Sequence, residues 1–170
     1  MKLEKHMNRR AFLTIAVAGT AAAALSTSLS AKDRDDKDKA SFDTVMAFMG
    51  AMGGGDMDTL DELMAGDMVW QNEGDPDLPW IGTWEGKEAI FGFLGMFSEN
   101  VQVTHWENQD AFASGDTVAV FGRMKLRLSN SGVETDEFTF ALRAKVRNGQ
   151  VVFWNWFEDS YAVSQAFHAT

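Results

Sequence analysis

The stretch ETDEFTFALRAKVRNGQVVFWNWFE, residues 134–158, decides the predicted fold because its apolar and polar side chains alternate. A period of two places the apolar side chains on one face of a β-strand and the polar ones on the other. Asn148-Gly149 interrupts the pattern, and both residues tolerate the positive φ angles of a tight hairpin turn. The stretch therefore predicts two antiparallel strands. The inner face of the first should carry Phe138, Phe140, Leu142, Ala144 and Val146.

The segment before this stretch continues the sheet. Thr117–Leu128 alternates in the same way and places Arg123, Lys125 and Arg127 on the outer face. Turn-forming residues at Ser114-Gly115-Asp116 and Asn130-Ser131-Gly132 mark two more reversals. Consecutive hairpins predict an antiparallel sheet.

Three helical patterns precede these strands. Apolar residues recur at helical spacing between Phe42 and Met52, and Gly53-Gly54-Gly55 ends the pattern. Asp56 can cap a second short helix, and Lys87–Ser98 has the pattern of a third. Helices segregated from an antiparallel sheet define the α+β class. We expect the three N-terminal helices to fill the concave side of a strongly curved sheet.

The first thirty residues have the character of an export signal. A basic head that contains Arg9-Arg10 precedes an Ala-rich run from Ala11 to about Leu25. Asn8–Thr14 (NRRAFLT) resembles the twin-arginine export motif. We predict a signal peptide at residues 1–30, cleavage near Ser30, and a periplasmic or extracellular protein. The run is too weakly hydrophobic for a permanent membrane anchor.

Charged residues dominate the segment after the predicted signal peptide. Lys32–Lys39 alternates in sign without an apolar residue, so residues 31–40 are predicted to form a charged linker before a domain at 41–168. The chain has no cysteine, which excludes disulfides, and its formal net charge is −10. An acidic domain repels phosphate backbones, so we expect no nucleic-acid partner.

A series of short motifs then runs in order through the domain. They are Gly55-Asp56-Met57-Asp58, Leu63-Met64-Ala65, Val69-Trp70, Pro79–Lys87, Ser114–Val118, Asn148–Val152 and Trp154–Asp159. Their order and spacing resemble the SnoaL-like (polyketide cyclase-like) branch of the nuclear transport factor 2-like, or ketosteroid isomerase-like, superfamily. The resemblance implies a cone: a curved antiparallel sheet whose helices close a deep pocket, often paired into a dimer through the sheet. The superfamily contains isomerases, cyclases, hydrolases and non-catalytic binders, so the fold does not determine the function.

Two catalytic sets known in the superfamily are not found in this chain. By the resemblance, the ketosteroid isomerase tyrosine falls on Phe48, its base on Asn72 and its oxyanion aspartate near Leu142. Phe and Leu donate no hydrogen bond, and Asn takes no proton at neutral pH. By the resemblance, the last catalytic aspartate of limonene-epoxide-hydrolase-like enzymes falls on Trp156, and the inward stretch just before Ala144 offers no Arg-x-Asp pair.

Aromatic residues dominate the predicted pocket. Strand parity and the resemblance place Trp154, Trp156 and Glu158 on the pocket face, and Trp70 and Asn72 share parity on the early strand. These aromatics could equally be the core that fills the narrow end of the cone. As ligand-binding candidates we take Phe48, Trp70, Trp80, Phe138, Phe140, Trp154 and Trp156.

Three residues are candidates for acid–base chemistry. Glu158 among tryptophans would have its ionised form disfavoured, which suits a general acid or base, unless it is solvated at the pocket mouth. His105 shares parity with Glu107 and could face inward with it, and Asn72 could position a substrate. No metal-ligand spacing or cofactor motif is present, so we expect neither. The acidic loop Glu73–Asp77 should overhang the mouth, where it would disfavour anionic ligands and tolerate neutral or cationic ones.

The outer face of the sheet suggests a homodimer. Phe153 and Phe157 have outer parity on the last strand, and exposed phenylalanines are commonly buried by a second copy. Three functions remain open: binding of a small neutral hydrophobic or aromatic molecule, catalysis as a lyase, isomerase or cyclase through Glu158 or His105, and protein interaction in the cell envelope.

Overall fold

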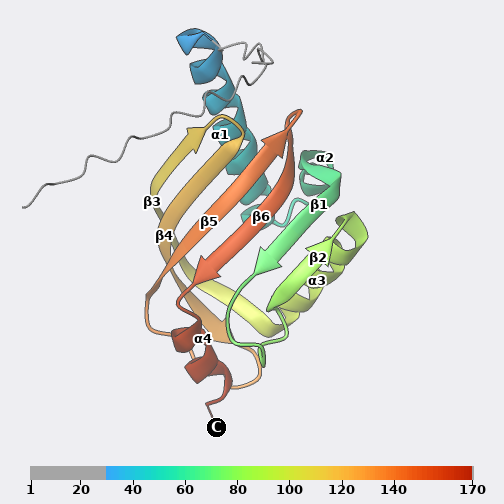
Figure 1. Cartoon of the computed structure of the whole chain (residues 1–170). Helices are drawn as coiled ribbons and strands as arrows, with labels where there is room; N and C mark the ends of the chain where they lie inside the picture. Colours follow the sequence, from blue (N-terminus) through green and yellow to red (C-terminus); the bar gives the residue numbers. More distant parts are fainter. Residues whose placement is uncertain (1–29, 170) are drawn as a thin grey trace, which may run out of the picture.

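The computed structural model describes residues 30–169, so the predicted signal peptide lies outside the described residues except for Ser30. One sheet curves around three helices, and a short fourth helix lies at the C-terminal end (Figure 1). The helices are α1 (Ala31–Gly54), α2 (Met57–Leu63), α3 (Lys87–Asn100) and α4 (Ser160–Phe167). The strands are β1 (Met64–Asn72), β2 (Gly82–Glu85), β3 (Val101–Ser114), β4 (Thr117–Leu128), β5 (Phe138–Arg147) and β6 (Gln150–Glu158). The predicted α+β fold is confirmed.

Local sequence signals determine where α1 ends and α2 begins. The left-handed Gly55, with φ 69°, ends α1 because glycine adopts this conformation without steric cost. The Asp56 side chain accepts a hydrogen bond from the backbone N–H of Thr59 and so caps α2, as predicted.

Helix α1 begins earlier than the sequence suggested. Residues 31–40, expected to form a solvated tether, are largely solvent-exposed but helical. Ser30 and Asp33 form a reciprocal capping box, and Lys39 pairs with Asp43 one turn later at 2.5 Å. A run of charged residues contains no helix breaker, so local caps and ion pairs can extend a helix whose far end is anchored by packing.

The sheet order is β2-β1-β6-β5-β4-β3. All neighbours are antiparallel except β1 and β6, which pair in parallel, so the expectation of a wholly antiparallel sheet is wrong at this one position. The turn signals govern only strands joined by a hairpin, whereas β1 and β6 are far apart in the sequence. The predicted Asn148-Gly149 hairpin is confirmed, with φ angles of 53° and 75°.

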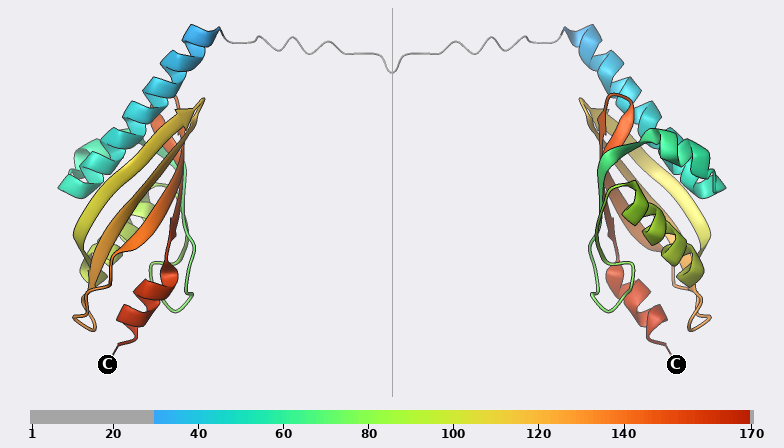
Figure 2. Two further views of the ribbon diagram at one scale, coloured as in Figure 1. Left: turned by 90° about the vertical axis from the view of Figure 1, so that its left-hand side faces the viewer. Right: turned by 90° about the vertical axis from the view of Figure 1, so that its right-hand side faces the viewer.

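Helices α1, α2 and α3 lie on the same side of the sheet, as the side views show (Figure 2). Buried residues of β4 and β5 alternate strictly with outward-facing ones. Helix α4, which no sequence pattern predicted, is held by the β4–β5 connection: Asn130 and Ser131 donate hydrogen bonds to its last carbonyls. Within residues 30–169, no helix is long and apolar enough to span a membrane.

Candidate functional site

A cavity of about 680 Å³ lies among the sheet and the ends of α1, α2 and α3. This volume is in the range of cavities that enclose small organic ligands. The β-strand lining consists of Trp70, Asn72, Val101, Val103, Trp106, Met124, Trp154, Trp156 and Glu158. The remaining lining consists of Met52, Gly53, Gly54, Gly55, Met57, Leu60, Trp80, Phe93, Leu94, Phe97 and Ser98.

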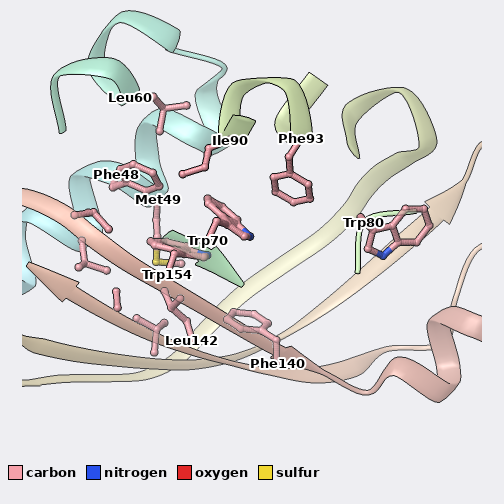
Figure 3. Close-up of a cluster of buried hydrophobic side chains, with 14 of the residues drawn as sticks. Phe48, Met49, Leu60, Trp70, Trp80, Ile90, Phe93, Phe140, Leu142 and Trp154 are labelled. Atoms are coloured by element: carbon pink, nitrogen blue, oxygen red, sulfur yellow. The ribbon is translucent and has the colours of Figure 1, made fainter. Parts of the chain in front are cut away.

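Buried aromatic side chains that include Phe48, Trp70 and Trp154 gather between the sheet and the helices (Figure 3). Trp70 and Trp154 stack with their ring centroids 5.1 Å apart, and Phe48 contacts Trp154 at 5.0 Å. All three side chains are buried. These aromatics therefore form part of the core, and Trp70 and Trp154 expose one edge of that core to the cavity.

Four of the seven predicted ligand-binding aromatics line the cavity: Trp70, Trp80, Trp154 and Trp156. Phe48, Phe138 and Phe140 are buried but do not line it. Phe140 instead lies behind the lining, because its ring packs against Trp106 at 4.5 Å and against Trp156 at 4.8 Å.

Glu158 lies where β6 ends and lines the cavity, as strand parity predicted. Its Oε2 accepts a 2.9 Å hydrogen bond from Trp156 Nε1. Burial raises the pKa of the Glu158 carboxyl, the indole hydrogen bond opposes this shift, and the negative charge of Asp159 adds to it. Among the described residues, Glu158 is the one titratable side chain that lines the cavity.

Asn72 also lines the cavity, but both the oxygen and the nitrogen of its side-chain amide form hydrogen bonds with other groups of the protein. Its Oδ1 accepts a 2.8 Å hydrogen bond from Trp70 Nε1, and its Nδ2 donates a 2.9 Å bond to the Trp80 carbonyl. Asn72 therefore links β1 to the loop that carries Trp80. This arrangement gives it a structural part in shaping the cavity.

The predicted inward orientation of His105 is wrong. The β3–β4 register shifts between Val103 and His105, and this irregularity moves His105 to the outer face opposite Lys125. There its Nε2 lies 3.6 Å from Glu137 Oε2. His105 does not reach the cavity, and Glu107, opposite Arg123, does not reach it either.

The same irregularity turns Trp106 into the cavity, which strand parity did not predict. Trp106, Phe140 and Trp156 form a layer of rings, and the Trp106 and Trp156 centroids are 5.7 Å apart. One sequence signal was available: Trp70-x-Asn72, Trp106-x-Asn108 and Trp156-x-Glu158 share a spacing. In each the indole N–H donates to the side chain two residues later.

The acidic loop Glu73–Asp77 does not line the cavity, so the expectation of an acidic rim is wrong. Asp75 instead accepts a hydrogen bond from Ser164 and fastens the loop to α4. Lysine, arginine and histidine are absent from the described lining. In the part of the chain that the structure describes, no three potential metal-binding side chains gather.

A curved sheet with helices on its concave side and a cavity between them defines the nuclear transport factor 2-like class. The SnoaL-like domain model matches residues 45–154, and the chain belongs to this family.

Solved structures share the fold. An NTF2-like protein from Burkholderia xenovorans is 27% identical, with a TM-score of 0.71, over 77% of this chain and 98% of its own. An NTF2-like protein from Burkholderia thailandensis is 22% identical, with a TM-score of 0.67, over 75% of this chain and 97% of its own. An LEH-like epoxide hydrolase from M. tuberculosis is 19% identical, with a TM-score of 0.61, over 76% of this chain and 90% of its own. The comparison with curated proteins gave no match.

Proposed function

We propose that this domain binds a small hydrophobic or aromatic molecule, neutral or cationic, in the cavity. The observation that carries the proposal is the lining itself: aromatic and aliphatic side chains surround about 680 Å³ with a single titratable group, Glu158, among the described residues. Burying an apolar ligand there would remove apolar surface from water, the main source of affinity in such pockets. An anionic ligand would meet no basic side chain among the described lining residues and would be repelled by an ionised Glu158.

The test is a fluorescence titration with N-phenyl-1-naphthylamine, a neutral aromatic probe that brightens in apolar surroundings. Leu94 and Met96 are both half-buried apolar residues of α3, but only Leu94 lines the cavity. We expect Leu94→Trp to fill the cavity and weaken probe binding on the order of tenfold, with Met96→Trp as the matched control. If Leu94→Trp and the unmodified protein bound the probe with equal affinity, the proposal would be wrong. Native mass spectrometry of the purified chain would search directly for a retained ligand.

Acid–base catalysis by Glu158 is a second candidate function. Burial raises the pKa of this carboxyl, and a perturbed carboxyl beside a cavity is suited to proton transfer. Glu158 would act without His105, which lies on the outer face. Slow conversion of a retained ligand that Glu158→Gln abolishes would support a lyase if the ligand mass changes, and an isomerase or cyclase if its chromatographic retention changes at equal mass; an unchanged ligand would argue for a binder.

We also propose that the protein is exported after cleavage near Ser30. The support is the sequence alone: Arg9-Arg10 at the head of an Ala-rich run. Replacing both arginines by lysine should retain full-length protein in the cytoplasmic fraction. N-terminal sequencing of the unmodified exported chain should begin near Ala31. An exported fraction unaffected by the double substitution would point to another route.

A further inference from the structure

Glu158 is the one charged residue among the described lining residues, while the indole N–H groups of Trp80 and Trp154 are buried without a hydrogen-bond partner among the described residues. The Asn72 amide accepts one hydrogen bond from Trp70 and donates one to the Trp80 carbonyl. One oxygen of Glu158 accepts the Trp156 indole N–H, and its other oxygen, Oε1, has no hydrogen-bond partner among the described residues. A half-buried carboxyl without a basic partner is a group on which a ligand could complete an ion pair.

The C-terminal ends of helices α1 and α3 lie at this cavity. Gly53 and Gly54 close α1, Ser98 lies in the last turn of α3, and all three line the cavity. A helix C-terminus carries about half a negative charge, which a basic side chain in the last turn commonly offsets. Neither α1 nor α3 has a basic residue in its last turn. These two helix ends favour positive charge nearby, and the N-terminus of α2, where Met57 also lines the cavity, opposes them in part.

Aromatic ring faces add a third favourable contribution. Trp106 and Trp156 line the cavity in one stacked layer, and 36% of Trp106 remains exposed. Indole faces attract cations through their quadrupole, more strongly when water is excluded. The chain as a whole has a formal net charge of −10, which would also draw a cation toward it.

We infer that the cavity takes an organic cation: a small molecule with an apolar body and an ammonium group placed between Glu158 and the Trp106–Trp156 rings. This inference rests on the proposed function, since it assumes that the cavity binds a small molecule, and it identifies the class of that molecule. The apolar body would occupy the space beside Trp70, Phe93 and Trp80, all of which line the cavity.

The inference has a pH signature. Among the described residues, Asp159 is the one charged group that shifts the Glu158 carboxyl, and it raises the pKa together with burial. Without a bound cation, Glu158 therefore holds its proton to a higher pH than an ordinary glutamate. A cation binds the ionised form, so binding releases this proton, and cation affinity rises as the pH rises through the Glu158 pKa. An uncharged ligand of the same shape would show no such rise.

Three probes with one body test the inference: 4-phenylbutylamine as the cation, 4-phenylbutanol as the neutral form and 4-phenylbutyrate as the anion. Isothermal titration calorimetry of the full chain should show the cation binding roughly tenfold more tightly than the alcohol, and the anion most weakly. In Glu158→Gln the ratio of cation to alcohol affinity should fall roughly several-fold, while the remaining ring faces still favour the cation. Glu107→Gln removes the same charge from the outer face and should keep the wild-type ratio. Repeating the titration in buffers of different ionisation enthalpy should reveal proton release on cation binding that diminishes as the pH is raised through the Glu158 pKa.

A second variant provides an independent test if Glu158→Gln fails to fold. Trp106→Leu keeps an apolar, partly exposed side chain but removes the ring, and it should lower the cation affinity more than the alcohol affinity. Alcohol affinity equal to or above cation affinity would overturn the inference while leaving the proposed function intact. Failure of all three probes to bind would overturn both.

Discussion

Gly122 determines where the aromatic layer beside the cavity lies. A Cβ at this position would come 2.1 Å from the Glu107 carbonyl oxygen and 2.5 Å from Cζ of Phe140. The carbonyl is backbone and Phe140 is buried, so neither can move cheaply. Glycine is therefore required here for close approach, even though Gly122 is not among the glycines with positive φ.

We expect Gly122→Ala to lower the free energy of unfolding by about 1–3 kcal/mol through overpacking. It should also displace Phe140 and weaken binding of the naphthylamine probe. Urea denaturation and the probe titration measure the two effects. Gly95→Ala is the control, because a Cβ there meets nothing within 4 Å. In the interior of α3 it should raise the unfolding free energy by roughly 0.5–1 kcal/mol. The same sign for both substitutions would contradict this account.

Residues within one uninterrupted stretch of strand could be assigned to a common face from the sequence, and residues on either side of an irregularity could not. Trp70, Asn72, Trp154, Trp156 and Glu158 line the cavity as parity predicted. Strand β3 has register shifts at two places, between Val103 and His105 and between Asn108 and Asp110. One extra residue moves every later side chain of the strand to the opposite face of the sheet. Nothing in a period-two pattern marks where that residue is inserted.

At the scale of elements, the sequence predicted the caps, turns and strands that depend on residues close together in the chain. Strand β4 has the predicted bounds, and the caps and hairpins around α2 and β5–β6 formed where turn and cap residues indicated. The parallel β1–β6 pair was missed because these strands are far apart in the sequence and no turn signal joins them. Helix α4 was missed because its anchors come from distant segments: Asp75, Asn130 and Ser131 bind it, and Phe167 packs edge-on against Trp80 at 5.6 Å.

At the scale of the whole molecule, the outer face of the sheet remains uncovered by any described helix (Figure 2). Its basic residues are partly paired: Arg123 binds Glu137 at 2.6 Å, and Arg127 binds Glu134 at 3.0 Å. Phe153, one of the two phenylalanines that suggested a dimer, is half-buried with the guanidinium of Arg143 over its ring. Phe157 is 39% exposed on the same face.

Two further phenylalanines extend this apolar region. Phe112 and Phe121 are 57% and 40% exposed, and their ring centroids lie 5.9 Å apart. Phe121 aligns across the sheet with Ala141, which in turn aligns with Phe157. Small residues between exposed rings make a flat surface that a second copy could cover by two-fold symmetry. A partner protein of the cell envelope could use the same surface.

We propose a homodimer through this face and expect Phe121→Glu to disrupt it. A charge at the centre of a symmetric contact would meet its own copy, so the dimer should weaken by about tenfold or more. Size-exclusion chromatography with light scattering at micromolar concentration measures the mass. Tyr161→Glu is the control, because Tyr161 is an aromatic residue, 70% exposed, on α4 instead of the sheet. It should leave the dimer mass unchanged, whereas a wild-type chain that elutes as a monomer would contradict the homodimer. In that case Phe112, Phe121 and Phe157 would be left for a different partner.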